Sequence, residues 1–276
     1  MYEKKSLVAD GFHTTYLEAG DPNRETVVLI HDGAFGTTAE LCWGAMIPLL
    51  SVHFHVLAPD LLGWGGTDKA VFLDRPPYAP RVKHIAAFCE ELGVDRAHFV
   101  GASFGGSMVM RAVSDPAGPW PVAKAISISG TGGPYRVPEG VVALGDYTPS
   151  IEDAARMTGY LVRSLDGLDD HIRQRYENSL IPGHYECMAA PRLSNPAVTR
   201  VPAADPYLDN LGTVQVPVLV VEGLRDELLE TGWSKKLADL GSNIHALEVD
   251  YAHEPNIDAP EDTARFVLEF LSGADR

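Results

Sequence analysis

The pentapeptide Gly101-Ala102-Ser103-Phe104-Gly105 has the pattern of a nucleophile elbow, a sharp turn that exposes a serine hydroxyl between a strand and a helix. A strand-like apolar run over residues 98–100 precedes it, and a helical pattern over residues 107–113 follows it. A helix that begins at Phe104 would direct free backbone N–H groups and its positive dipole end toward an anion formed at Ser103. The pattern therefore predicts attack of a serine hydroxyl on a carbonyl carbon.

A serine hydroxyl reacts only when a base takes its proton, and His253 is the base that we predict among the ten histidines. His253 follows a strand-like run that ends at Val249, so a loop at the carboxyl edge of a parallel sheet would carry it to the elbow. His31 is the one competitor, because it ends a strand beside the elbow. A structural role in that turn is the interpretation that we favour for His31.

The histidine needs a carboxylate that orients its ring, and Asp226 is the predicted partner. Asp226 lies a few residues past the apolar run 216–221 and before His253, so the chain order is serine, aspartate, histidine. Glu222 and Glu227 are the rival acids, and we interpret them as strand-end and helix-cap charges.

Stabilising an oxyanion requires two N–H donors. One is predicted to be Phe104, directly after the nucleophile. The other is expected from the loop after the strand-like run 27–30, where Gly33 is our choice and Ala34 the alternative.

The elements that must position these residues form an α/β pattern. Continuous apolar runs, typical of strands buried on both faces, alternate with amphipathic helical stretches, which predicts a mostly parallel central sheet flanked by helices. The N-terminal segment through Gly20 predicts an antiparallel hairpin at one edge. The predicted strands cover residues 27–30, 56–58, 98–100, 125–128, 216–221 and 244–249, and the clearest helices cover 82–92, 107–113 and 261–271.

Residues 130–212 break this alternation with prolines and helical segments, so we predict an inserted helical cap there and an α/β core at 1–129 and 213–276. Ser150 has the spacing of a helix capping box, and residues 169–180 form a second, charged helical stretch. Apolar residues of the cap and of the first loops are expected to line a substrate pocket. These are Phe35, Trp43, Met157 and Leu161, together with Phe104.

Composition restricts the class of protein. The chain has 276 residues, a net charge of −16 and three cysteines without CxxC spacing. Such a charge argues against nucleic-acid binding, and no apolar run reaches the roughly 18 residues of a membrane span. We expect a cytoplasmic protein with a small-molecule substrate, without a metal site or a cofactor, and we leave formation of a homodimer open.

Taken together, these motifs resemble the α/β-hydrolase superfamily over almost the whole chain outside the cap. The resemblance implies a Ser103–Asp226–His253 triad. The spacing from His31 to Trp43 is similar to that of the carbon–carbon hydrolases that cleave aromatic meta-cleavage products. The matching segments are residues 31–36, 58–65, 101–106 and 223–226, and His253 before the last helix.

Three positions depart from that subgroup, in which asparagine precedes the nucleophile, asparagine precedes the tryptophan and tryptophan follows the histidine. Here these positions hold Ala102, Cys42 and Glu254. Asp32 also replaces the usual glycine after His31. These departures weaken the assignment of a dienoate substrate but leave the shared chemistry.

The leading hypothesis is therefore a serine hydrolase that cleaves a small or medium carboxylic ester or lactone through an acyl-enzyme. The alternative is a carbon–carbon bond hydrolase of a vinylogous diketone, which predicts a cationic pocket residue. A third hypothesis is a hydrolase-like receptor for a small molecule. The candidate cations for the alternative are Arg136, Arg156, Arg163 and Arg192.

Overall fold

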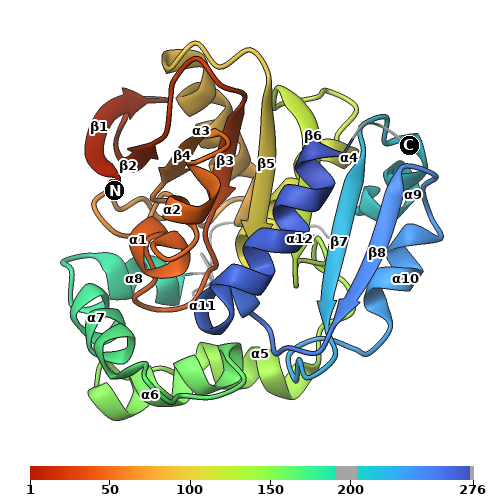
Figure 1. The fold of residues 1–276 in the computed structure, drawn as a ribbon. Coiled ribbons are helices and arrows are strands. Elements are labelled where there is room, and N and C mark those ends of the chain that lie inside the picture. Colours follow the sequence, from red (N-terminus) through yellow and green to blue (C-terminus); the bar gives the residue numbers. More distant parts are fainter. Residues whose placement is uncertain (191–203, 274–276) are drawn as a thin grey trace.

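A twisted sheet of eight strands forms the centre of the computed structural model, which describes residues 1–190 and 204–273 (Figure 1). The strand order is β1-β2-β4-β3-β5-β6-β7-β8. The pairs β1/β2 and β2/β4 are antiparallel and all the other pairs are parallel, as the sequence predicted for the N-terminal hairpin and the central sheet. The strands are β1 (Glu3–Ala9), β2 (Phe12–Ala19), β3 (Thr26–Ile30), β4 (His55–Pro59), β5 (Ala97–Ala102), β6 (Val122–Ile128), β7 (Val218–Gly223) and β8 (Ile244–Val249).

Helices cover both faces of the sheet, because successive residues of each central strand point to opposite sides. In β3, Val28 and Ile30 pack into one apolar cluster, whereas Val27 and Leu29 pack into the other. One face is covered by α3 (Tyr78–Glu91), α4 (Phe104–Ser114), α9 (Tyr207–Asn210), the 3-10 turn η2 (Leu211–Thr213) and α10 (Trp233–Ala238). The other is covered by α1 (Ala39–Trp43), α2 (Ile47–Leu50) and α12 (Pro260–Ser272), which α11 (Pro255–Asp258) precedes.

A row of helices between β6 and β7 lies beyond the carboxyl ends of the strands (Figure 1). The Ser150 hydroxyl accepts a hydrogen bond from the Asp153 amide at 3.1 Å, which confirms the predicted helix start. The limits of a separate cap at residues 130 and 212 stay a prediction. The helices are α5 (Pro138–Gly145), α6 (Ile151–Leu161), α7 (Asp169–Ser179) and α8 (His184–Ala189).

The long predicted helices are present with small shifts at their ends. The short helices α1, α2 and α11 were not predicted, because four or five residues are too few to show a helical period. Among the helices of the described residues, none has the length and apolar character that crossing a bilayer would require.

The turn between β5 and α4 depends on close backbone approach. Ser103 has φ 51° and ψ −110°, a combination that side chains rarely adopt and that places its hydroxyl above the end of the sheet. A Cβ atom on Gly105 would lie 2.2 Å from the carbonyl oxygen of Ile30. Only glycine therefore lets α4 start directly against β3.

We expect Gly105→Ala to lower the free energy of unfolding by about 3 kcal/mol, because β3 and α4 would have to separate. Urea unfolding followed by circular dichroism measures this change. Gly159→Ala is the matched control. Gly159 lies exposed in α6, and a Cβ atom there would meet only a side-chain carbon of Leu165 at 4.0 Å, so alanine should raise stability by about 0.5–1 kcal/mol. Equal effects of the two substitutions would contradict this account of the turn.

Candidate active site

Ser103, His253 and Asp226 lie in one hydrogen-bonded row, although they are far apart in the sequence. The Nε2 atom of His253 lies 2.8 Å from the Ser103 hydroxyl, and its Nδ1 atom lies 2.6 Å from Oδ2 of Asp226. Asp226 can only accept, so Nδ1 carries the proton and Nε2 is left to accept the serine proton. The side chains of His253 and Asp226 are 3% and 2% exposed, which excludes water from this contact. The row has the geometry of a nucleophile, a general base and an orienting carboxylate.

The competing residues occupy structural positions. The His31 ring is fully buried, accepts a hydrogen bond from the Leu61 amide at 2.9 Å and donates from Nδ1 to the Asp32 carbonyl at 2.6 Å. The carboxylate of Glu222 accepts hydrogen bonds from Gly232 and Ser234 at the start of α10. Glu227 is exposed. Both ring nitrogens of His31 and both carboxylate oxygens of Glu222 therefore already have hydrogen-bond partners.

The predicted oxyanion donors lie next to each other. Phe104 is the first residue of α4, where a backbone N–H has no intrahelical acceptor, and a Cβ atom on Gly33 would lie 2.7 Å from Cβ of Phe104. The alternative donor, Ala34, is engaged, because its amide donates to Oδ1 of Asp32 at 2.7 Å. This favours Gly33 over Ala34 as the second donor.

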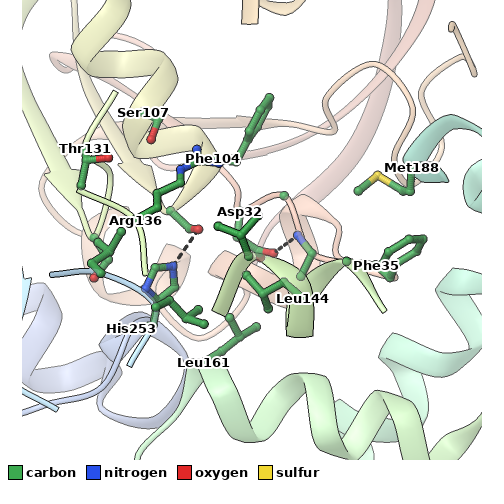
Figure 2. A pocket seen from close by; sticks show the side chains of 18 residues that line it. Asp32, Phe35, Phe104, Ser107, Thr131, Arg136, Leu144, Leu161, Met188 and His253 are labelled. Atoms are coloured by element: carbon green, nitrogen blue, oxygen red, sulfur yellow. Dashed lines mark hydrogen bonds between the residues drawn. The ribbon is translucent and has the colours of Figure 1, made fainter. Parts of the chain in front are cut away.

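A cavity of about 300 Å³ opens beside the Ser103 hydroxyl (Figure 2), which is enough for a small or medium organic substrate. Phe35 and Leu161 line it, as predicted. Most of its wall is apolar, and it draws on the loop after β3, the elbow, α5 and the loops after β6 and β7. The lining residues are Asp32, Gly33, Ala34, Phe35, Ser103, Phe104, Ser107, Ser129, Thr131, Arg136, Val141, Leu144, Gly145, Leu161, Met188, Leu228, Leu229 and His253.

The prediction that Trp43 and Met157 line the pocket was wrong. Trp43 is fully buried in the core between α1 and the sheet. Met157 is also fully buried and packs behind the cavity wall against Phe35 and Tyr147. An apolar helix position indicates burial but does not tell a pocket wall from the core behind it.

Of the three candidate arginines in the described part of the chain, one reaches the cavity. Arg136 lines it and donates to the Tyr78 hydroxyl at 2.6 Å. Arg156 instead donates to Asp153 and to the backbone carbonyl of Ala143 in α5. Arg163 lies over the ring of Tyr251 at 5.0 Å. Arg192 lies outside the described residues.

The three departures from the carbon–carbon hydrolase pattern do not face the substrate. Ala102 and Cys42 are buried in the core, and Glu254 is completely buried behind the cavity. Burial raises the pKa of Glu254 well above its usual value, and the neighbouring Asp32 raises it further. None of the three is among the described residues that line the cavity.

His184 joins α8 to the loops under the cavity, a role that the sequence did not reveal. Its Nε2 atom accepts from the Gly36 amide at 2.9 Å, and its Nδ1 atom donates to the Gly63 carbonyl at 3.0 Å. The contact with Gly36 requires the neutral ring, because a protonated Nε2 atom could not accept. Burial lowers the pKa of His184 to about 4, in agreement with that state.

Comparison with known proteins assigns the chain to a family. The sequence profile of the alpha/beta hydrolase family matches residues 27–266. The chain therefore belongs to the alpha/beta hydrolases, and it is a hydrolase of that family, as its resemblance implied.

Curated relatives extend over nearly the whole chain. A 2-hydroxy-6-oxo-2,4-heptadienoate hydrolase of Pseudomonas putida is 26% identical over 98% of this chain and 97% of its own length. A 2-hydroxy-6-oxononadienedioate/2-hydroxy-6-oxononatrienedioate hydrolase of Burkholderia vietnamiensis is 30% identical over 96% and 94%.

Solved structures show the same fold. The meta-cleavage product hydrolase of Pseudomonas fluorescens IP01 superimposes with a TM-score of 0.83 at 26% identity, with 98% of each chain covered. A carboxylesterase of Bacillus subtilis shares the fold with a TM-score of 0.81 at 18% identity, over 100% of this chain and 93% of its own.

The neutral state of His184 makes stability depend on pH. Because its folded pKa is lowered to about 4 from an ordinary value near 6.5, its contribution is complete above pH 6.5 and is lost as the pH falls toward 4. We expect His184→Ala to reduce the slope of unfolding free energy against pH between 5 and 6.5 by up to about 1.4 kcal/mol per pH unit.

Urea unfolding at several pH values measures that slope. His245→Gln serves as the control, since His245 is exposed on the edge strand β8. A slope in His184→Ala that equals the wild-type slope would show that His184 does not titrate on unfolding in this range.

Proposed function

We propose that this protein is a serine hydrolase that cleaves a carbon–carbon bond next to a ketone, in a substrate whose departing half carries an anionic group. The observation that carries the proposal is the position of Arg136, a cation on the wall of the cavity that contains Ser103 and His253. Within the described part of the chain, no carboxylate lies in ion-pair distance of Arg136. The names of the full-length relatives support the same class of substrate.

In the first half-reaction, the hydroxyl oxygen of Ser103 attacks the ketone carbon while His253 takes the hydroxyl proton. The resulting oxyanion would accept hydrogen bonds from the Phe104 and Gly33 amides. Asp226 stabilises the imidazolium that forms and keeps its ring in place. The close contact of Gly33 with Phe104 keeps both donors on one side of the ketone.

Collapse of the tetrahedral intermediate breaks the carbon–carbon bond. The electron pair stays on the departing carbon, which His253 protonates, so that carbon must be activated by conjugation to a second carbonyl group. A vinylogous diketone meets this requirement, because the pair delocalises into the distant carbonyl. A water molecule, activated by His253, then hydrolyses the acyl ester of Ser103, and each step uses only water and residues of this chain.

Hydrolysis of a carboxylic ester or lactone is a second candidate function, and a specific observation favours it. The carbon–carbon hydrolases that this chain resembles have two asparagines and a tryptophan at three positions. This chain has Ala102, Cys42 and Glu254 there, and these residues make no polar contact in the cavity. The alcohol part of an ester leaves as an alkoxide, which His253 can protonate. Cleavage of an ester therefore needs fewer protein contacts to the departing half of the substrate. The same three residues would carry out both reactions.

We expect Ser103→Ala to lower kcat at least about 10³-fold with either substrate class, because the nucleophile is lost. Release of 4-nitrophenol from short 4-nitrophenyl esters, with circular dichroism for folding, measures this. The wild-type protein should complete many turnovers per molecule. A single turnover followed by a stable complex would instead favour the receptor hypothesis, and wild-type rates in Ser103→Ala would exclude this serine.

We expect Arg136→Gln to lower kcat/KM for a 2-hydroxy-6-oxo-dienoate at least tenfold but to change that for neutral 4-nitrophenyl esters less than threefold. The reason is that only the first substrate places a carboxylate near the guanidinium. Loss of dienoate absorbance measures the first rate. Arg163→Gln is the matched control outside the cavity. No dienoate cleavage by the wild type, with efficient ester cleavage, would select the second candidate function.

A further inference from the structure

Asp32 brings a negative charge to the wall of the cavity, an unusual position beside an oxyanion hole. Asp32 is 1% exposed and lines the cavity, and its carboxylate accepts hydrogen bonds from the Ala34 amide and the Thr37 hydroxyl, at 2.7 and 2.5 Å. These two contacts hold the carboxylate in one orientation. Both partners belong to the same loop as Asp32, so these two hydrogen bonds could serve only to stabilise that loop. The residues packed behind Asp32 give a further reason to examine its charge.

A second acid lies directly behind it. A carboxyl oxygen of Asp32, a carboxyl oxygen of Glu254 and the sulfur of Cys42 all lie within 4.8 Å of one another. Glu254 is completely buried, and neither of its carboxyl oxygens has a hydrogen-bond partner among the described residues. Its backbone amide donates to the Leu161 carbonyl at 2.7 Å, which ties the residue after His253 to the end of α6. A carboxyl group that is buried without a hydrogen-bond partner favours its neutral form, so the fixed negative charge at this part of the cavity is that of Asp32.

One buried cation lies near this pair of residues. Arg175 of α7 is fully buried, donates to the Phe35 carbonyl at 3.1 Å and lies 3.3 Å from Nε2 of His171. Its positive charge acts on Glu254 from behind the cavity, and it does not line the cavity itself. The charge that faces the substrate on this side is the carboxylate of Asp32.

The opposite charge stands at the other side of the site. In Figure 2, Arg136 lies on the same side as His253, whereas Asp32 lies toward Leu144, Phe35 and Met188. Since His253 protonates the departing group, that group must lie toward His253 and thus toward Arg136. The acyl group must then extend along the wall formed by Asp32 and Phe35.

We propose that Asp32, backed by Glu254, determines specificity by rejecting substrates with a carboxylate on the acyl side. The substrate would bind with an uncharged acyl group toward Asp32 and Phe35, and any anionic group would belong to the departing half. This inference rests on the proposed function, because it requires an acyl-enzyme on Ser103. An anion in the acyl part would have to lose its hydration beside a fixed carboxylate, which is unfavourable in a cavity of low dielectric.

Two esters with the same leaving group and chain length test this inference at pH 7. They are 4-nitrophenyl pentanoate and the 4-nitrophenyl monoester of glutaric acid, which differ by a terminal carboxylate on the acyl chain. We expect wild-type kcat/KM to be at least tenfold higher for the neutral ester. Comparable values, within threefold, would overturn the inference whatever the variants do.

The double variant Asp32→Asn/Glu254→Gln removes both acids and keeps Arg175. We expect the preference for the neutral ester to fall at least tenfold, because the negative charge of Asp32 is lost while the positive charge of Arg175 stays. Asp250→Asn/Glu269→Gln is the control with the same two kinds of substitution at exposed positions, and it should keep the wild-type ratio. An unchanged ratio in the folded double variant would overturn the inference.

If circular dichroism shows that the double variant does not fold, Asp32→Asn alone carries the test, since asparagine can still accept from the Ala34 amide. We expect the single variant to lower the ratio at least threefold, and an unchanged ratio would again overturn the inference. Failure of the proposed function looks different. In that case the wild type would release no 4-nitrophenol from the neutral ester and would cleave no dienoate, whereas failure of this inference leaves an active enzyme with no charge preference.

Discussion

The hydrogen bond between Nε2 of His253 and the Ser103 hydroxyl, at 2.8 Å, is the contact that makes the site reactive. Two independent constraints produce it. The strained backbone of Ser103, permitted by Gly105 against β3, raises the hydroxyl above the sheet. The Asp226 carboxylate fixes the imidazole tautomer from the other side. Loss of either constraint would leave the two atoms near each other but not in a reactive arrangement.

Electrostatics distinguishes this site from a simple apolar esterase pocket. Arg136 and Asp32 place opposite charges on the two sides of the nucleophile, so the cavity has a direction as well as a volume. On this view, similarity to carbon–carbon hydrolases is compatible with the three departures at Ala102, Cys42 and Glu254. Under the proposed function the chemistry would be the same as in these relatives, and different residues would hold the substrate.

Local patterns predicted the parts of the molecule that depend on neighbours in the sequence. The two-faced strands, the capped start of α6 at Ser150 and the elbow around Ser103 could all be anticipated, because periodicity, capping and turn chemistry act over a few residues. Trp43 and Met157 were assigned to the wrong surroundings. A buried apolar side chain looks the same in sequence whether it touches substrate or only the core.

Residue type and position after a strand were enough to identify the family, the central sheet and the serine, histidine and aspartate of the site. They could not show that Arg136 reaches the cavity, or that the ionisable residues Asp32, Glu254 and Arg175 are buried near one another. These residues come from separate loops and from α7, so no local pattern relates them. Charges interact through space at distances that only the packed chain defines.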